Sequence, residues 1–169
     1  VPPLRKKNLR EKKSRKKNKY AIINMDDTYA KRISMQDIGA KVLSFGKNDN
    51  ADLKFKIISQ SLDKTKFTLS FMNDTQNFEL PIFGEHNIYN LCAALLAASV
   101  YQANPLEVLG KLNAKFIVPG RLQRVENNKG LHVFIDYAHS PAALDNVLSF
   151  IHDIKKDNAK DLYCVFGCG

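Results

Sequence analysis

The chain has 169 residues, enough for one full domain or for one domain and part of a second. Its hydrophobic fraction of 44% and charged fraction of 25% are ordinary for a soluble globular protein, and its net charge is +9. No apolar run approaches the roughly 18 residues that span a bilayer. The charged N-terminus also lacks the apolar core of a secretory signal, so we expect neither a membrane protein nor a secreted one.

The net charge comes entirely from residues 1–20. This leader holds ten Lys or Arg and one Glu, which leaves 16 basic and 16 acidic residues of the totals of 26 and 17 for the rest of the chain. Such a tail could bind nucleic acid or anionic lipid, but it has no aromatic side chain before Tyr20 on which bases could stack. We expect a solvated leader, disordered or helical, and no nucleic-acid partner. A non-enzymatic nucleic-acid-binding protein is the alternative from another class.

Short strands are expected first along the chain. Residues 20–24 (YAIIN) are predicted to form a strand that ends at the turn-forming MDD, and residues 41–46 (KVLSFG) the next strand, after a short helix or loop. Between residues 53 and 82 apolar and polar residues nearly alternate, with turn signals at LDKT and NDTQ. This pattern predicts an antiparallel meander with one face in the core and one in water.

Helical spacing follows. Apolar residues lie nearly all round from Ile88 to Val100, which predicts a buried helix that begins near Gly84 and Asn87. A second helix is expected over residues 104–115 (NPLEVLGKLNAK), because its Pro suits a first helical turn.

The C-terminal part has the pattern of a parallel α/β domain. Residues 131–136 (LHVFID) are nearly continuously apolar, as in a parallel strand. Residues 140–154 are predicted to form a helix, with Ser140 as N-cap and Pro141 at the first helical position. Residues 161–167 (DLYCVFG) would form the next strand. Strand, helix and strand in this order are typical of a parallel sheet.

These patterns divide the chain into four expected segments. They are a leader over residues 1–20, the C-terminal part of a central domain over 21–120, a linker over 121–130, and the beginning of another domain over 131–169. Cys92, Cys164 and Cys168 form neither a CxxC pair nor a regular framework, so we expect buried thiols in a reducing cytoplasm.

Five short motifs occur together in an order and spacing that are specific in combination. They are AIINMDD at 21–27, GEHNIYN at 84–90, VPGRLQRV at 118–125, DYAHSPAAL at 136–144 and VFGCG at 165–169. Over about residues 20–169 this arrangement resembles the Mur ligase family, most closely its UDP-N-acetylmuramoyl-tripeptide synthetases. The resemblance implies an α/β fold: the end of a central ATP-binding domain with a mixed sheet, followed by the beginning of a Rossmann-like C-terminal domain.

The resemblance also implies an activity, that of an ATP-dependent amide ligase of peptidoglycan precursor synthesis with ATP and Mg²⁺ as cofactors. ATP would phosphorylate the terminal carboxylate of UDP-N-acetylmuramoyl-L-alanyl-D-glutamate, and the amine of meso-diaminopimelate or L-lysine would attack the acyl phosphate. These small-molecule substrates imply a cytoplasmic enzyme, which we expect to be a monomer without a membrane partner. A ligase of the folylpolyglutamate or cyanophycin synthetase type is the alternative with the same chemistry.

By the resemblance, Asn87, Asn90, Arg121 and Asp136 would bind the nucleotide, and Arg121 and His139 would act in catalysis. Asn87 and Asn90, three residues apart on one helical face, could hydrogen-bond an adenine edge. Helix capping and a surface amide are the structural alternative, and spacing alone leaves the choice open. Arg121 could offset phosphate charge during phosphoryl transfer, whereas without the resemblance it would be a loop charge.

Asp136 and His139 follow the strand expected over residues 131–136. Ligands of parallel sheets gather at the carboxyl ends of strands, where Asp136 could accept both hydroxyl protons of a ribose and His139 could donate to a phosphate or orient the acyl group. The structural alternative is an Asp and Ser cap beside a hydrogen-bonded histidine. No metal ligand is assigned: Lys6 is the nearest candidate for the family's carbamylated lysine, but Arg10 stands where an aromatic residue is expected.

The family's Gly-rich phosphate loop, its UDP-sugar domain and its segment that selects the diamino acid are expected outside this sequence. We therefore predict that the purified 169-residue chain neither holds ATP firmly nor forms an amide bond. Measurable ligation of diaminopimelate to the UDP-muramoyl dipeptide by this chain alone would contradict the prediction.

Overall fold

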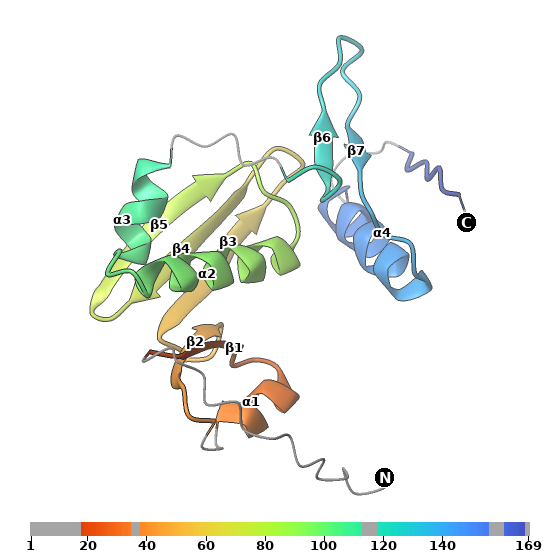
Figure 1. The fold of residues 1–169 in the computed structure, drawn as a ribbon. Coiled ribbons are helices and arrows are strands. Elements are labelled where there is room, and N and C mark those ends of the chain that lie inside the picture. The colour runs from red at the N-terminus through yellow and green to blue at the C-terminus, as the bar shows by residue number, and fades with distance from the viewer. Residues whose placement is uncertain (1–17, 35–37, 113–117, 156–160, 168–169) are drawn as a thin grey trace, which may run out of the picture.

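A computed structural model describes residues 18–34, 38–112, 118–155 and 161–167 (Figure 1). These residues form a five-stranded sheet with helices and a two-stranded hairpin followed by a helix, which confirms the predicted α/β class. The strands are β1 (Tyr20–Asn24), β2 (Lys41–Gly46), β3 (Leu53–Gln60), β4 (Thr65–Phe71), β5 (Asp74–Leu80), β6 (Gln123–Val125) and β7 (Val133–Ile135). The helices are α1 (Thr28–Ser34), α2 (Glu85–Ser99), α3 (Pro105–Lys111) and α4 (Pro141–Lys155).

The large sheet has the strand order β1-β2-β3-β4-β5 and changes its pairing in the middle. β1, β2 and β3 pair in parallel, whereas β3, β4 and β5 pair antiparallel, so the predicted meander is confirmed. The pairing of β2 with β3 joins Phe45 to Leu53 and Gly46 to Lys54, at the end of one strand and the start of the next. Because the overlap is so short, a brief loop can join these strands without the crossover that parallel pairs usually need.

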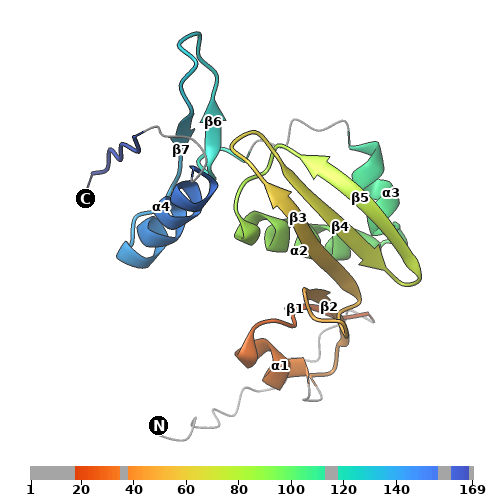
Figure 2. The same ribbon diagram turned by 180° about the vertical axis from the view of Figure 1, so that it is seen from behind.

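The core lies between the meander and helices α2 and α3, which cover the same face of the sheet (Figures 1 and 2). The alternating apolar residues point inward, as predicted, and several of them are fully buried: Leu53, Phe55, Phe67 and Leu69. The predicted helix is present as α2, but its burial is confined to one face, where Ile88, Cys92, Leu95 and Leu96 lie. Alanines occupy much of its other side, where exposing a small side chain costs little.

The Asp26 carboxylate ties α2 to the parallel strands. It accepts hydrogen bonds from the backbone N–H groups of Lys47 (2.6 Å) and Asn48 (3.2 Å), just after β2, and from the Tyr89 hydroxyl (2.8 Å) on α2. Burial raises the pKa of Asp26, but these hydrogen bonds and the Lys47 charge outweigh burial and lower the pKa below its usual value. Gly46 makes this approach possible, because a Cβ there would lie 2.6 Å from Asp26 Oδ2.

The C-terminal part differs from the prediction. The segment 131–136 is not a parallel strand among the described residues: β7 pairs antiparallel with β6, and Ile135 is 50% exposed. Residues 161–167 form no strand, and Val165 is 98% exposed. A strand requires a hydrogen-bonding neighbour, and no described strand pairs with this segment. The predicted helix is present as α4, where the Ala143 N–H donates to Ser140 Oγ (3.3 Å).

The remaining expectations have mixed outcomes. Cys92 is buried as predicted, whereas Cys164 is exposed because its segment packs in no sheet, and Cys168 lies outside the described residues. Residues 1–17 of the leader also lie outside them. Within the described parts of the chain, no helix is both long and apolar enough to cross a membrane.

Tyr89→Phe should reveal the contribution of the Asp26 hydrogen bond to stability. The ring, which packs edge-on against Phe55 with centroids 4.8 Å apart, is kept, while the carboxylate loses a charge-assisted donor. We expect the free energy of unfolding in urea to fall by about 1.5 kcal/mol at pH 7. The folded pKa of Asp26 is lowered, so its stabilisation exists above the unfolded pKa of about 4 and is lost as pH falls through the folded pKa.

The difference between wild type and Tyr89→Phe should therefore narrow in acid. Tyr101→Phe, at a residue that is 86% exposed, is the matched control and should change little. A loss of the same size at every pH would contradict the role given to Asp26.

Candidate functional site

A cavity of about 560 Å³ lies where the first turns of α2, the segment before it and residues 118–126 meet. Three of the predicted site residues, Asn87, Asn90 and Arg121, line it together. Apolar side chains form much of the remaining wall: Ile82, Phe83, Leu91 and Leu122. This size and this mixture of apolar wall and a few polar groups are typical of small-molecule sites.

The two asparagines form a short row of amides on α2. Asn87 Nδ2 donates to the Phe83 carbonyl oxygen (2.7 Å), and Asn90 Nδ2 faces Asn87 Oδ1 at 3.4 Å. The helix begins after Gly84 without a side-chain cap, so capping does not explain Asn87. The hydrogen bond to the main chain fixes the plane of the Asn87 amide, and the row presents donors and acceptors to the cavity.

Arg121 lies in a tight turn that the hairpin stabilises. Its N–H donates to the Val118 carbonyl oxygen (3.1 Å), and Gly120 before it has φ +69°. Leu122 after it has φ +45°, a rare conformation for a residue other than glycine, although it is 1% exposed. Burial of this side chain and the hydrogen bond from its N–H to Asp136 Oδ2 (2.7 Å) hold the unusual backbone in place.

Asp136 shapes the turn behind Arg121 and is not among the described residues that line the cavity. Its Oδ2 accepts from the Leu122 N–H and its Oδ1 accepts from the Ala138 N–H (2.8 Å), so both oxygens bind residues that lie outside the helices. Each oxygen keeps a further acceptor position, and a role toward ribose stays a prediction.

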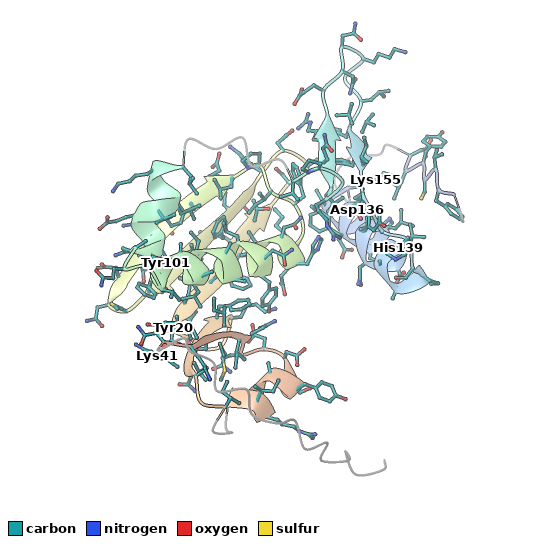
Figure 3. The ribbon with its side chains drawn as sticks, in the orientation of Figure 1. Tyr20, Lys41, Tyr101, Asp136, His139 and Lys155 are labelled. Carbon is teal, nitrogen blue, oxygen red and sulfur yellow. The ribbon has the colours of Figure 1, made fainter. Side chains whose placement is uncertain are left out.

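His139 lies farther along the chain, beside α4 (Figure 3). It is exposed, its Nδ1 donates to the Tyr137 carbonyl oxygen (3.0 Å), and its ring contacts the Tyr137 ring edge-on. The structure does not bring His139 into the lining of the cavity. Its catalytic role therefore also stays a prediction.

His86, in the first turn of α2, is not among the described residues that line the cavity, but its electrostatic surroundings connect it to Asp136 and Arg121, and the sequence analysis did not single it out. The pKa of His86 is lower than usual, mainly because neighbouring atoms remove water from its ring. The Asp136 carboxylate raises this pKa, and the Arg121 guanidinium lowers it. Both charges therefore act on one ring at the start of α2. Gly84, at φ +79°, lies under that ring, since a Cβ there would be 2.6 Å from His86 Cε1. The sequence signal was the Gly two residues before His86 in GEHNIYN.

The His86 pKa should report on both charged neighbours. Asp136→Asn removes the charge that raises the pKa and should lower it further, whereas Arg121→Gln should raise it, as measured by NMR titration of the His86 ring protons. Asp49→Asn, on an exposed loop residue, is the control. Equal titration curves for all variants would mean that Asp136 and Arg121 do not converge on this ring.

Two family models match the chain. The Mur ligase middle domain matches residues 5–98, more than half of the chain, and the Mur ligase glutamate ligase domain matches residues 120–169.

Curated relatives carry the name UDP-N-acetylmuramoyl-L-alanyl-D-glutamate–2,6-diaminopimelate ligase. The protein from Geobacter metallireducens is 34% identical over 154 residues, which cover 91% of this chain and 29% of the relative. The protein from Geobacter sulfurreducens is 36% identical over 155 residues, which cover 91% of this chain and 30% of the relative. The chain thus spans less than a third of the length of these relatives.

Solved structures agree with the sequence matches. A UDP-N-acetylmuramoyl-L-alanyl-D-glutamate–2,6-diaminopimelate ligase has a TM-score of 0.58 and 29% identity, covering 79% of this chain and 28% of that chain. A MurF ligase from Thermotoga maritima, in complex with ADP, has a TM-score of 0.60 and shares the fold at 21% identity, covering 79% and 30%. From its family-model matches, relatives and fold, the chain belongs to the Mur ligase family.

Proposed function

We propose that this chain forms the nucleotide-facing part of an ATP-dependent amide ligase of peptidoglycan precursor synthesis. The observation that carries the proposal is the meeting of Asn87, Asn90 and Arg121 around one cavity. The names of the relatives add the substrate class, a UDP-muramoyl dipeptide and 2,6-diaminopimelate. We therefore favour diaminopimelate over lysine as the amine that is added.

In this proposal ATP supplies the phosphoryl group that activates the substrate carboxylate for attack by the amine. The chain contributes binding and charge. The amides of Asn87 and Asn90 recognise the edge of a planar base, and the Ile82 and Leu91 side chains provide an apolar wall for its faces. The Arg121 guanidinium offsets the negative charge of a phosphate with several N–H donors.

Three further residues outside the lining of the cavity have roles in this proposal. Asp136 offers carboxylate oxygens to ribose hydroxyls while it keeps its hydrogen bond to the Leu122 N–H. The lowered pKa of His86 keeps its imidazole neutral near pH 7, so it adds no second positive charge beside Arg121. His139 orients the acyl or phosphoryl group in this proposal.

The donor set fits a nucleoside better than a metal ion. Among the described residues no group of three or more His, Cys, Asp or Glu side chains could hold a metal. Mg²⁺ belongs to the proposal as the usual companion of ATP.

We also propose the division into a central-domain part (21–120), a linker (121–130) and the beginning of a C-terminal domain (131–169). The cavity takes its lining residues from the first two of these segments, which supports a site at their proposed junction. We propose a monomeric, cytoplasmic enzyme; the free thiols of Cys92 and Cys164 are in keeping with a reducing compartment.

Titration of ¹⁵N-labelled chain with ADP tests the site even when binding is weak. We expect the side-chain amide signals of Asn87 and Asn90 and the Arg121 N–H to shift with one common dissociation constant. Asn87→Ala should raise this constant about fivefold to tenfold, the value of one or two lost hydrogen bonds. Asn77→Ala, at an exposed position of β5, is the matched control. Shifts confined to other regions, or an unchanged constant in Asn87→Ala, would sink the proposal.

A further inference from the structure

Two neighbouring side chains of the β6–β7 hairpin contact the turn between β3 and β4 and the segment between β5 and α2. Arg124 and Phe134 are direct partners across the antiparallel ladder, so their side chains lie side by side. Arg124 Nη1 donates to the Leu62 carbonyl oxygen (3.3 Å) and pairs with the Asp63 carboxylate, in the turn between β3 and β4. The Phe134 ring meets the Phe83 ring edge-on, with centroids 5.5 Å apart.

Both contacts lie in the wall of the cavity. Asp63, Phe83 and Arg124 all line it. Phe83 is 5% exposed, and its carbonyl oxygen accepts the hydrogen bond that orients Asn87. Phe83 thus contacts the hairpin through its ring and orients the Asn87 amide through its carbonyl oxygen.

Hydrogen bonds connect the turn that carries Arg121 to the hairpin. The ladder joins Arg124 to Phe134, and two residues farther along Asp136 accepts the Leu122 N–H, next to Arg121. The turn and the hairpin are therefore one hydrogen-bonded unit. Where this unit docks on the sheet decides where the Arg121 guanidinium lies.

We propose that Arg124 and Phe134 are positioning residues that dock the hairpin on Asp63 and Phe83 and so hold Arg121 at the cavity. The inference rests on the proposed function for its ligand, an adenine nucleotide, while the docking itself belongs to the chain alone. By linkage, a ligand that contacts both walls strengthens the docking as much as the docking strengthens its binding.

Charge reversal tests the docking in two readouts. Asp63→Lys and Arg124→Glu each place like charges together, and Asp63→Lys with Arg124→Glu restores an opposite pair. Without ligand, we expect each single variant to lose the nuclear Overhauser contact between the Phe83 and Phe134 rings, and the double variant to regain it. With ADP, the dissociation constant should rise about twofold to fivefold in each single variant and recover at least partly in the double variant.

The control reverses an ion pair outside the cavity, Asp49→Lys with Lys54→Asp, whose partners lie 3.0 Å apart. It should change neither readout. The proposal is overturned if the single variants keep the contact between the Phe83 and Phe134 rings, or if they lose it and still bind ADP as tightly as wild type. It is also overturned if the double variant recovers neither the ring contact nor ADP binding. If the wild-type chain shows no response to ADP while charge reversal still breaks the ring contact, the proposed function fails and the docking contact stands.

Discussion

The hydrogen bond from Tyr89 to Asp26 fixes how α2 is rotated above the sheet. Successive residues of a helix are rotated by about 100° around its axis. When Tyr89 is held toward the sheet, Asn90 is rotated from it by about 100° and Asn87 by about 160° in the same direction. The two amides must then lie close together and face away from the strands. The same carboxylate binds the Lys47 N–H after β2, which ties the rotation of the helix to the end of the parallel strands.

The opposite wall depends on a second carboxylate with a similar task. Asp136 accepts the Leu122 N–H and supports a left-handed backbone that a buried leucine would not adopt by itself. Behind each wall, a carboxylate outside the cavity thus binds a main-chain N–H group distant in sequence, that of Lys47 for Asp26 and that of Leu122 for Asp136. His86, in the first turn of α2, has its pKa raised by the Asp136 carboxylate and lowered by the Arg121 guanidinium, both from the segment that carries the hairpin. The site is therefore made by non-local contacts between segments whose own structures are simple.

Local patterns predicted the fold where local chemistry decides it. The alternation over 53–82 determined which side chains face the core, so the meander was predictable. The segments 131–136 and 161–167 were predicted as parallel strands from their apolar runs. The prediction failed because such a run indicates a preference for extended backbone but does not determine which strand pairs with it. Of the site residues that the motifs predicted, Asn87, Asn90 and Arg121 line one cavity, whereas Asp136 and His139 do not. His86 was missed because the charges that affect its pKa come from residues distant in sequence. Asp63 was missed because it lies in a segment that indicated only a turn.

The arrangement around Asp136 also makes the base of the hairpin selective by polarity. A carboxylate offers lone pairs and no protons, and two of its acceptor positions already receive backbone N–H groups. A group that binds to the remaining acceptor positions of this carboxylate must be a hydrogen-bond donor. In the proposed function, ribose hydroxyls donate to this carboxylate, and the negatively charged phosphates lie toward the Arg121 guanidinium in the same turn. In the proposed function, the carboxylate and the guanidinium of this short turn together determine the orientation of an elongated ligand that carries its negative charge at one end.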